Sequence, residues 1–226
     1  MALLSGVTDL RADFAAHRDQ VRAAQMSAYM KHRFAFFGVP APARRAIAKV
    51  FVASGAGLSA GGLIEHAESC WVQPEREFQY VGADLLARWA PRLTPDDIEA
   101  VGRLITTKPW WDTVDTLAVH VVGSLVATHP DVRQVMDQWI EADDIWLART
   151  ALLHQLRYGQ ATDAERLFRY ALLRADDTEF FIRKAIGWAL RQYARCEPEA
   201  VRTFVVEHGD DFSALTRREA LKHLAT

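Results

Sequence analysis

Residues 108–117 read KPWWDTVDTL and combine two adjacent tryptophans with two acids in a segment of helical character. Trp111 and Asp115 stand four residues apart, so they share one helix face, while Asp112 is displaced by about 100°. Pro109 is typical of a first helical turn, where the helix dipole favours an ionised carboxylate. The stretch therefore predicts an indole beside a carboxylate, which suits a cation. The structural alternative is a core tryptophan and an aspartate that serves the helix end.

The same pattern recurs along the second half of the chain. Trp111, Trp146 and Phe181 are spaced by 35 residues, and residues 215–221 (LTRREAL) repeat the pattern within one residue. Shorter helices are expected between them, at residues 131–139, 163–174 and 198–207. Helix pairs at this spacing are typical of an α-solenoid, in which one helix of each pair lines the concave face. With no strand alternation, the sequence predicts an all-α solenoid of antiparallel helix pairs.

The first half of the chain is expected to be helical too. We predict helices over residues 9–24, 43–52, 75–89 and from Thr94 to about Thr106, the last opened by a Thr-Pro cap. Residues 29–38 (YMKHRFAFFG) are both aromatic and basic. Residues 54–62 are glycine-rich but lack the Gly-Lys-Ser/Thr of a phosphate loop, so we expect a flexible helix connection.

Composition excludes several classes of protein. The 226 residues, half of them apolar and a quarter charged, can bury a full core, and we expect a single domain over residues 1–226. The net charge of −2 argues against an indiscriminate polyanion binder, so any nucleic-acid surface must be a patch. Cys70 and Cys196 lack metal or redox spacing and are expected as buried thiols. No signal or membrane segment is recognisable, and we expect a cytoplasmic protein.

Cations recur in the register of the Trp111 helix. Arg149, Lys184 and Arg218 occupy related positions in successive repeats, and Trp188 follows Lys184 by one turn. Equivalent repeat positions converge on one surface of a solenoid, so these side chains are expected around Asp115 in a groove. The alternative is that they are solvated helix charges.

These motifs resemble the AlkD family of bacterial alkylpurine DNA glycosylases. The resemblance lies in residues 29–31 (YMK), 75–79 (EREFQ), 110–115 (WWDTVD), 145–151 (IWLARTA), 180–188 (FFIRKAIGW) and 217–222 (RREALK), and it covers about residues 29–224. It implies a HEAT-like repeat solenoid that holds duplex DNA in its concave face. It also implies excision of cationic N7- or N3-alkylated purines, without flipping the base into a pocket.

Family roles can be carried over by motif position. The resemblance implies that Trp111, Asp115 and Trp188 are catalytic, that Arg149 contacts a phosphate, and that Tyr29 lines the same cleft. The remaining expected DNA contacts are Lys31, Arg45, Lys184, Arg191 and Arg218. We expect a monomer that acts on double-stranded DNA carrying alkylated purines, with no metal, no other cofactor and no membrane partner.

The expected chemistry needs few groups. An alkylated purine already carries positive charge and leaves readily, so only the developing sugar oxocarbenium needs stabilising. At about 4 Å and an effective dielectric near 20, one carboxylate–cation contact is worth roughly 4 kcal/mol, about a thousandfold in rate. The indoles add a cation–π attraction of about 0.5–2 kcal/mol. Asp115 can also orient the attacking water.

Two other functions fit the sequence. One is a DNA-binding HEAT-repeat protein of the same family without catalysis, and the other is a protein-interaction scaffold. The joint presence of Trp111, Asp115, Arg149 and Trp188 favours the enzyme, because a pure binder needs no carboxylate beside DNA phosphates. A scaffold leaves an acid inside a basic cleft unexplained.

Overall fold

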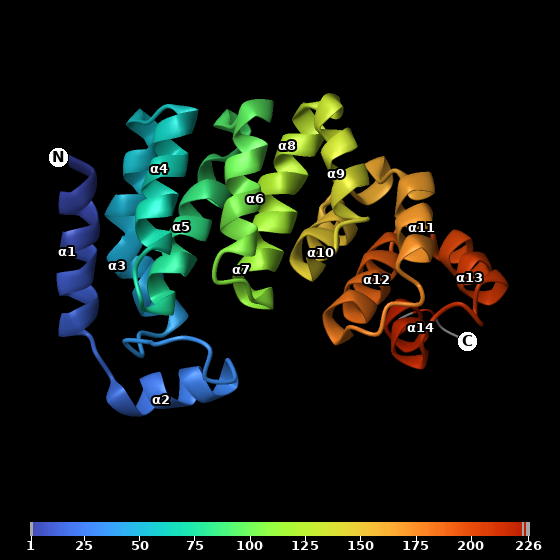
Figure 1. The fold of residues 1–226 in the computed structure, drawn as a ribbon, viewed down its shortest axis with the longest axis horizontal. Helices are drawn as coiled ribbons and strands as arrows, with labels where there is room; N and C mark the ends of the chain where they lie inside the picture. The colour runs from blue at the N-terminus through green and yellow to red at the C-terminus, as the bar shows by residue number, and fades with distance from the viewer. Residues whose placement is uncertain (1, 223, 225–226) are drawn as a thin grey trace. The chain divides into compact units, whose positions relative to one another are not determined.

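The structure, a computed structural model, describes residues 2–222 and 224. The chain forms two compact units, Met1–Thr107 and Lys108–Thr226 (Figure 1). Among the described residues there is no sheet, and β-type pairing is confined to an isolated bridge between Ala35 and Glu75. This confirms the all-α class. That the two units make one continuous repeat domain remains a prediction.

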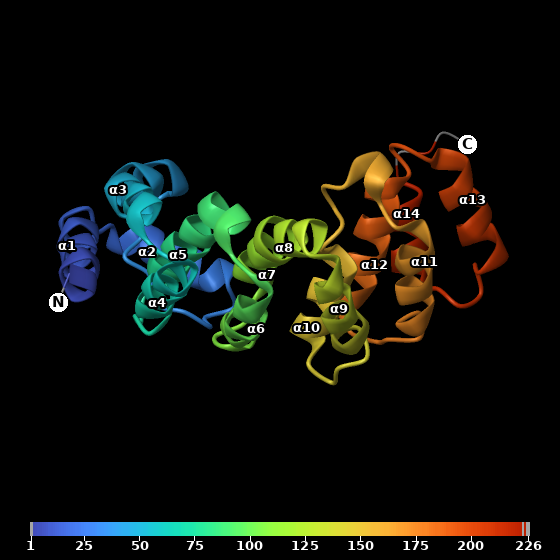
Figure 2. The same ribbon diagram turned by 90° about the horizontal axis from the view of Figure 1, so that it is seen from above.

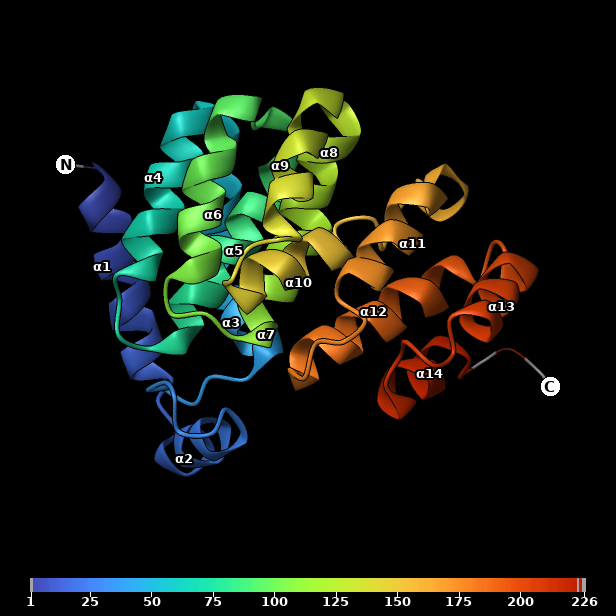
Figure 3. The ribbon, with the colours of Figure 1, turned by 45° about the vertical axis from the view of Figure 1, so that its right-hand side comes forward.

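Unit 1 is a stack of helices that run side by side (Figures 1 and 2). Its α-helices are α1 (Ala2–Ala16), α2 (Gln20–Tyr29), α3 (Ala41–Ser54), α4 (Ala60–Trp71), α5 (Arg76–Trp89) and α6 (Ile98–Thr106), with 3-10 turns η1 (Gly55–Gly57), η2 (Ala90–Arg92) and η3 (Pro95–Asp97). Helix α5 packs against both α3 and α4, and α4 packs against α6. Helix α2 differs, since it runs across the ends of the others and has no buried residue (Figures 1 and 3).

Two predictions in unit 1 were wrong. The helix expected over residues 9–24 is broken, because the Asp19 side chain accepts a hydrogen bond from the Arg22 amide and starts α2 afresh. The glycine-rich stretch is not a free connection throughout. Ser59 caps α4 through the Gly62 amide, and the glycines at 61 and 62 form the first turn of that unpredicted helix. The helices expected at residues 43–52, 75–89 and up to Thr106 are confirmed, with the first extended to 41–54.

Buried polar side chains at the start of α5 fix the segment between α2 and α3. Glu77 Oε1 accepts hydrogen bonds from the amides of Gly38 (2.9 Å) and Val39 (3.2 Å). Gln79 Nε2 donates to the carbonyl of Gln73, 2.9 Å away, in the turn between α4 and α5. Gly38 has φ +90°, and a Cβ there would lie 2.1 Å from the Asp19 carbonyl oxygen. The EREFQ motif is therefore structural.

Unit 2 contains the 35-residue register. Its elements are α7 (Trp111–Thr116), the π-helical segment η4 (Leu117–Val122), α8 (Gly123–Thr128), η5 (Pro130–Val132), α9 (Arg133–Trp139), α10 (Ile145–Leu153), η6 (Gly159–Ala161), α11 (Ala164–Leu173), α12 (Phe180–Tyr193), α13 (Pro198–Glu207) and α14 (Ala214–Ala220). Asp144, Asp163 and Ser213 cap α10, α11 and α14 with their side chains. Helix α10 packs on α7 and α12, and α12 packs on α14 (Figure 3). The four helices of the predicted register are therefore neighbours in sequence order.

An aromatic cluster joins α7, α10 and α12, and its first member is Trp110 rather than the expected Trp111. The ring centroid of Trp110 lies 5.7 Å from that of Trp146 and 4.9 Å from that of Phe181. The ring centroids of Trp146 and Phe181 are 5.0 Å apart. Trp110 is extended (φ −162°) and precedes the helix, whereas Trp111 is the first helical residue and is half-buried. Trp110, rather than Trp111, is the core indole. The N-terminal position of Trp111 agrees with the prediction, although Pro109 lies before the helix.

The π-helical segment η4 continues α7 without a break and leads directly into α8. It begins two residues after Asp115. Insertions of this kind are rare and occur most often near functional sites.

None of the helices in the described part of the chain is long and apolar enough to cross a membrane. Cys70 is buried as expected, whereas Cys196 is partly exposed.

The contact between α12 and α14 leaves no room for a side chain at Gly187. A Cβ there would lie 2.5 Å from Glu219 Cβ and 3.0 Å from the Thr216 carbonyl oxygen. Gly187→Ala should gain up to about 1 kcal/mol of helix propensity but lose roughly 1–3 kcal/mol to overpacking. We expect a net loss in the free energy of unfolding, measured with urea.

Gly61→Ala is the matched control, because an added methyl at this helical glycine meets nothing within 4 Å. It should leave stability unchanged or slightly higher. A Gly187→Ala protein as stable as the Gly61→Ala protein would show that the two helices are not in close contact.

Candidate functional site

The centre of unit 2 is an ion pair between Asp115 on α7 and Arg149 on α10. Arg149 Nε donates to Asp115 Oδ1 at 2.7 Å, and Nη2 donates to Oδ2 at 2.8 Å, so the pair is bidentate. The Arg149 side chain is 2% exposed and that of Asp115 is 21% exposed. Each carboxylate oxygen retains a second lone pair. Asp115 is therefore oriented from beneath by a buried cation and open to solvent on its other side.

Arg149 is held by α12 as well. Its Nη1 donates to the Phe181 carbonyl oxygen, and its guanidinium carbon lies 5.4 Å from the centroid of the Trp188 ring. The guanidinium thus joins the carboxylate on α7 to an indole on α12. The structure brings together three of the four residues expected to form the centre of the site, namely Asp115, Arg149 and Trp188.

Burial raises the pKa of Asp115, and the neighbouring Asp112 raises it further, while the hydrogen bonds and charge of Arg149 oppose the shift. Asp112 belongs to the same helix, and its Oδ1 accepts a hydrogen bond from the Thr113 amide. Without Arg149 the carboxyl would be still easier to protonate. The arginine therefore opposes protonation of a partly desolvated carboxylate.

A second ion cluster lies along α12. Lys184 Nζ and Arg191 Nη1 contact the two carboxylate oxygens of Glu219 on α14, at 2.9 Å and 2.7 Å. Lys184 Nζ also lies 5.2 Å from the Trp188 ring centroid, so this indole contacts two cations, Lys184 and Arg149. Lys184 and Arg191 lower the pKa of Glu219, and its carboxylate partly neutralises the two cations.

The other predicted residues occupy different settings. Trp111 lies on α7 one turn before Asp115, and Arg218 is exposed on α14. In unit 1, Tyr29 is 69% exposed, and Lys31 and Arg45 are exposed. That Arg149 contacts a phosphate remains a prediction. The partner of Arg149 in the structure is the carboxylate of Asp115. No group of three or more histidines, cysteines or acids that could hold a metal lies within residues 2–222 or at 224.

A sequence-family model described as DNA alkylation repair enzyme matches residues 10–224. The chain belongs to this family. A solved structure described as a predicted DNA alkylation repair enzyme from Enterococcus faecalis is 35% identical, covers 92% of this chain and 97% of its own, and superposes with a TM-score of 0.86. The structure of smu.31 from Streptococcus mutans UA159, 12% identical over 80% of this chain and 98% of its own (TM-score 0.60), shares the fold. A comparison with curated proteins gave no match.

Sequence reasoning missed two residues of this alkylation repair protein's site. Glu219 was part of a recognised motif, but no role was predicted for it, and the structure shows it bridging Lys184 and Arg191. An acid inside a repeated row of cations could have indicated such a partner. The carbonyl of Phe181, which accepts from Arg149, has no signal in the sequence.

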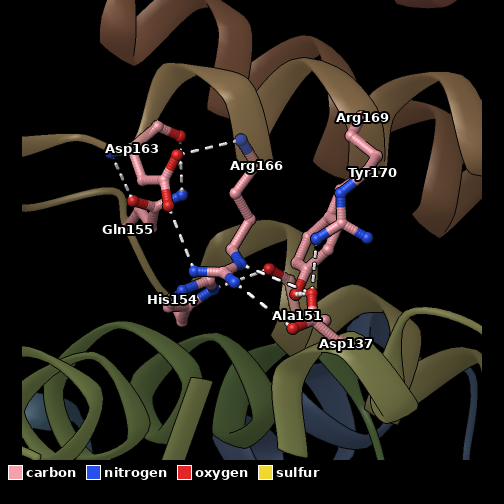
Figure 4. Close-up of polar contacts among 8 residues, drawn as sticks. All are labelled: Asp137, Ala151, His154, Gln155, Asp163, Arg166, Arg169 and Tyr170. Atoms are coloured by element: carbon pink, nitrogen blue, oxygen red, sulfur yellow. Dashed lines mark hydrogen bonds and ion pairs between the residues drawn. The ribbon is translucent and has the colours of Figure 1, made fainter. Parts of the chain in front are cut away.

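A different polar cluster, on α9 to α11, has a structural role (Figure 4). Asp137 accepts from the Tyr170 hydroxyl at 2.8 Å and pairs with Arg166 at 3.2 Å and with Arg169. Burial alone would raise the pKa of Asp137, but these hydrogen bonds and charges lower it. Arg166 also pairs with Asp163, the cap of α11, at 3.1 Å. The cluster ties α9 to α11.

His154 lies beside this cluster and is fully buried, with Nδ1 2.7 Å from the Ala151 carbonyl oxygen (Figure 4). Burial lowers its pKa from 6.5 to about 4, so the folded protein keeps it neutral where the unfolded chain binds a proton. Its stability contribution is complete above pH 6.5. It should be lost progressively as the pH falls towards 4, by up to roughly 3 kcal/mol.

His154→Asn should flatten this slope when the free energy of unfolding is measured between pH 4 and pH 7. Burial raises the pKa of Glu77 and of Asp115. These two carboxyl groups therefore raise the free energy of unfolding as the pH falls through this window, whereas His154 lowers it. The comparison of wild type with His154→Asn therefore isolates the histidine. Parallel slopes for the two proteins would rule out a neutral buried His154.

Proposed function

We propose that this protein is a DNA glycosylase that hydrolyses the N-glycosidic bond of cationic N7- or N3-alkylated purines in duplex DNA. The observation that carries the proposal is the setting of Asp115, whose carboxylate is aligned by a buried arginine while 21% of its side chain remains exposed. Membership of the DNA alkylation repair family supports the DNA substrate.

The proposed reaction uses the charge of the substrate. The bond between the sugar C1′ and the purine nitrogen breaks, and its electrons neutralise the cationic base, which leaves without a general acid. Asp115 stabilises the oxocarbenium that develops on the sugar. It also accepts a hydrogen bond from the water that attacks C1′, and the water's proton passes to solvent. The product is an abasic site and a free alkylpurine.

Arg149 acts through Asp115 in this proposal. A carboxylate held by two parallel hydrogen bonds needs little reorganisation when charge develops beside it. Trp111 and Trp188 contribute π-faces that attract the cationic sugar and exclude bulk water. The roles of Tyr29, Lys31, Arg45, Lys184, Arg191 and Arg218 in DNA binding are part of the same proposal. In this proposal the protein recognises DNA through contacts with its phosphates and not through the edges of its bases.

Asp115→Asn tests the catalytic role, because it keeps the size of the side chain and removes its charge. Single-turnover release of 7-methylguanine should fall by about two to three orders of magnitude, from a Coulomb interaction of roughly 4 kcal/mol discounted for solvation. Stability should also fall, by roughly 1–3 kcal/mol, since Arg149 loses a charged hydrogen-bond partner.

Activity in this experiment must therefore be expressed per folded molecule, with melting temperature and duplex affinity measured on the same preparation. Removing an anion near DNA phosphates should leave duplex affinity equal or slightly tighter. Near-normal release of 7-methylguanine by folded Asp115→Asn protein would end the catalytic assignment and leave a DNA-binding role.

Arg218→Ala tests phosphate recognition. Arg218 is exposed on α14, next to the Glu219 that holds Lys184 and Arg191. Affinity for undamaged duplex should fall steeply with salt and show little sequence preference, and the variant should reduce the logarithmic salt slope by about 1. Arg133→Ala, which removes an exposed cation on α9, is the control and should leave the slope unchanged. Salt-independent binding, or equal slopes for the two variants, would contradict this interface.

A further inference from the structure

Positive charge is concentrated in one segment of unit 1. Residues 18–49 contain seven lysines and arginines and a single acid, Asp19, although the whole chain carries a net charge of −2. Asp19 caps α2 and lies 3.6 Å from Arg22. The segment covers α2, the irregular residues 30–40 and most of α3. It has the electrostatic character expected of a surface that meets a polyanion.

The turn after α2 exposes two of these cations, Lys31 and Arg33, with His32 between them. Lys31 (φ +56°) and His32 (φ +57°) are left-handed, which non-glycine residues rarely adopt. The turn is fixed by hydrogen bonds from the His32 amide to the Ser27 carbonyl (2.7 Å) and from Ser27 Oγ to the Phe34 carbonyl (3.0 Å). Lys31, His32 and Arg33 are exposed. The strained turn therefore presents basic side chains side by side.

Beside this turn lies an apolar hollow of about 250 Å³. It is lined by Met26, Tyr29, Met30, Phe36 and Tyr80, together with the polar side chains of Arg22 and Gln25. Tyr29 is 69% exposed, and Arg44 lies 4.6 Å from the Tyr80 ring centroid. Aromatic and thioether side chains present polarisable surfaces, and none of the described residues that line the hollow is an acid. Aromatic groups interleaved with cations are the usual means of binding unstacked nucleobases.

We propose that this hollow is a binding site for an unstacked nucleobase of DNA, with Arg22, Lys31 and Arg33 contacting the flanking phosphates. The base stacks on Tyr29 between the apolar walls, without readout of its edges. The site lies within unit 1 and binds undamaged DNA. It rests on the DNA-binding roles proposed above for Tyr29 and Lys31, but it does not require excision in unit 2. It favours DNA in which a base has already left the stack, as at a bulge or in a single strand.

The test compares two undamaged duplexes that differ by one unpaired adenine. Wild-type protein should bind the bulged duplex about tenfold more tightly than the fully paired one, as measured by fluorescence anisotropy, because stacking adds to the phosphate contacts. Replacing the unpaired adenine by 2-aminopurine should give a change in its fluorescence on binding. Equal affinity for the two duplexes, or an unchanged 2-aminopurine signal, would overturn the proposal.

Variants assign the effect to the hollow. Tyr29→Ala should abolish the preference for the bulge, whereas Tyr29→Phe, which keeps the ring, should retain it. Val72→Ala is the matched control, since Val72 is 73% exposed in unit 1 and does not line the hollow. The Asp115→Asn protein should keep the full preference for the bulge. The binding result can therefore be interpreted even if the protein does not excise alkylpurines. Preference retained by folded Tyr29→Ala would exclude the hollow as the site.

Discussion

The buried guanidinium of Arg149 is the group on which the arrangement of unit 2 depends. It links a carboxylate on α7, its own helix α10 and a carbonyl on α12, and it lies against the Trp188 ring. A buried charge is costly unless its partners satisfy it with good geometry, and here both carboxylate oxygens and a carbonyl do so. The same contacts fix the direction of Asp115. Packing of three helices and orientation of one carboxylate thus have a common origin.

Much of the architecture could be predicted from the sequence, because helix pairs repeat and their caps are local. Residues at equivalent repeat positions are neighbours in space, which is why Asp115 and Arg149, 34 residues apart, could be expected together. Lys184, in the next repeat, lies 5.2 Å from the Trp188 ring centroid, a contact that follows from their spacing of one helical turn.

Sequence reasoning did not decide between adjacent residues, and it did not identify the protein partners of every charged side chain. Sequence periodicity does not distinguish Trp110 from Trp111, because the deciding factor is the extended backbone before α7. An arginine in a site is compatible with a phosphate and with a carboxylate, and the structure shows that the carboxylate of Asp115 is a partner of buried Arg149, while the phosphate contact stays a prediction. Similarly, the cap of Asp19 outweighs a continuous helical pattern, since it depends on a side chain turning back onto the backbone.

The π-helical segment η4 has a consequence for the phase of the helix that carries Asp115. The buried residues of α7, η4 and α8 include Val114, Ala118, Val122 and Val126, at intervals of four. In a uniform α-helix, such a stripe drifts by about 40° at each interval and would wind away from its neighbour. The wider π turn takes up this drift. A single helix can therefore keep one face against α10 through α7 and η4 and still present Asp115 to Arg149 at its beginning.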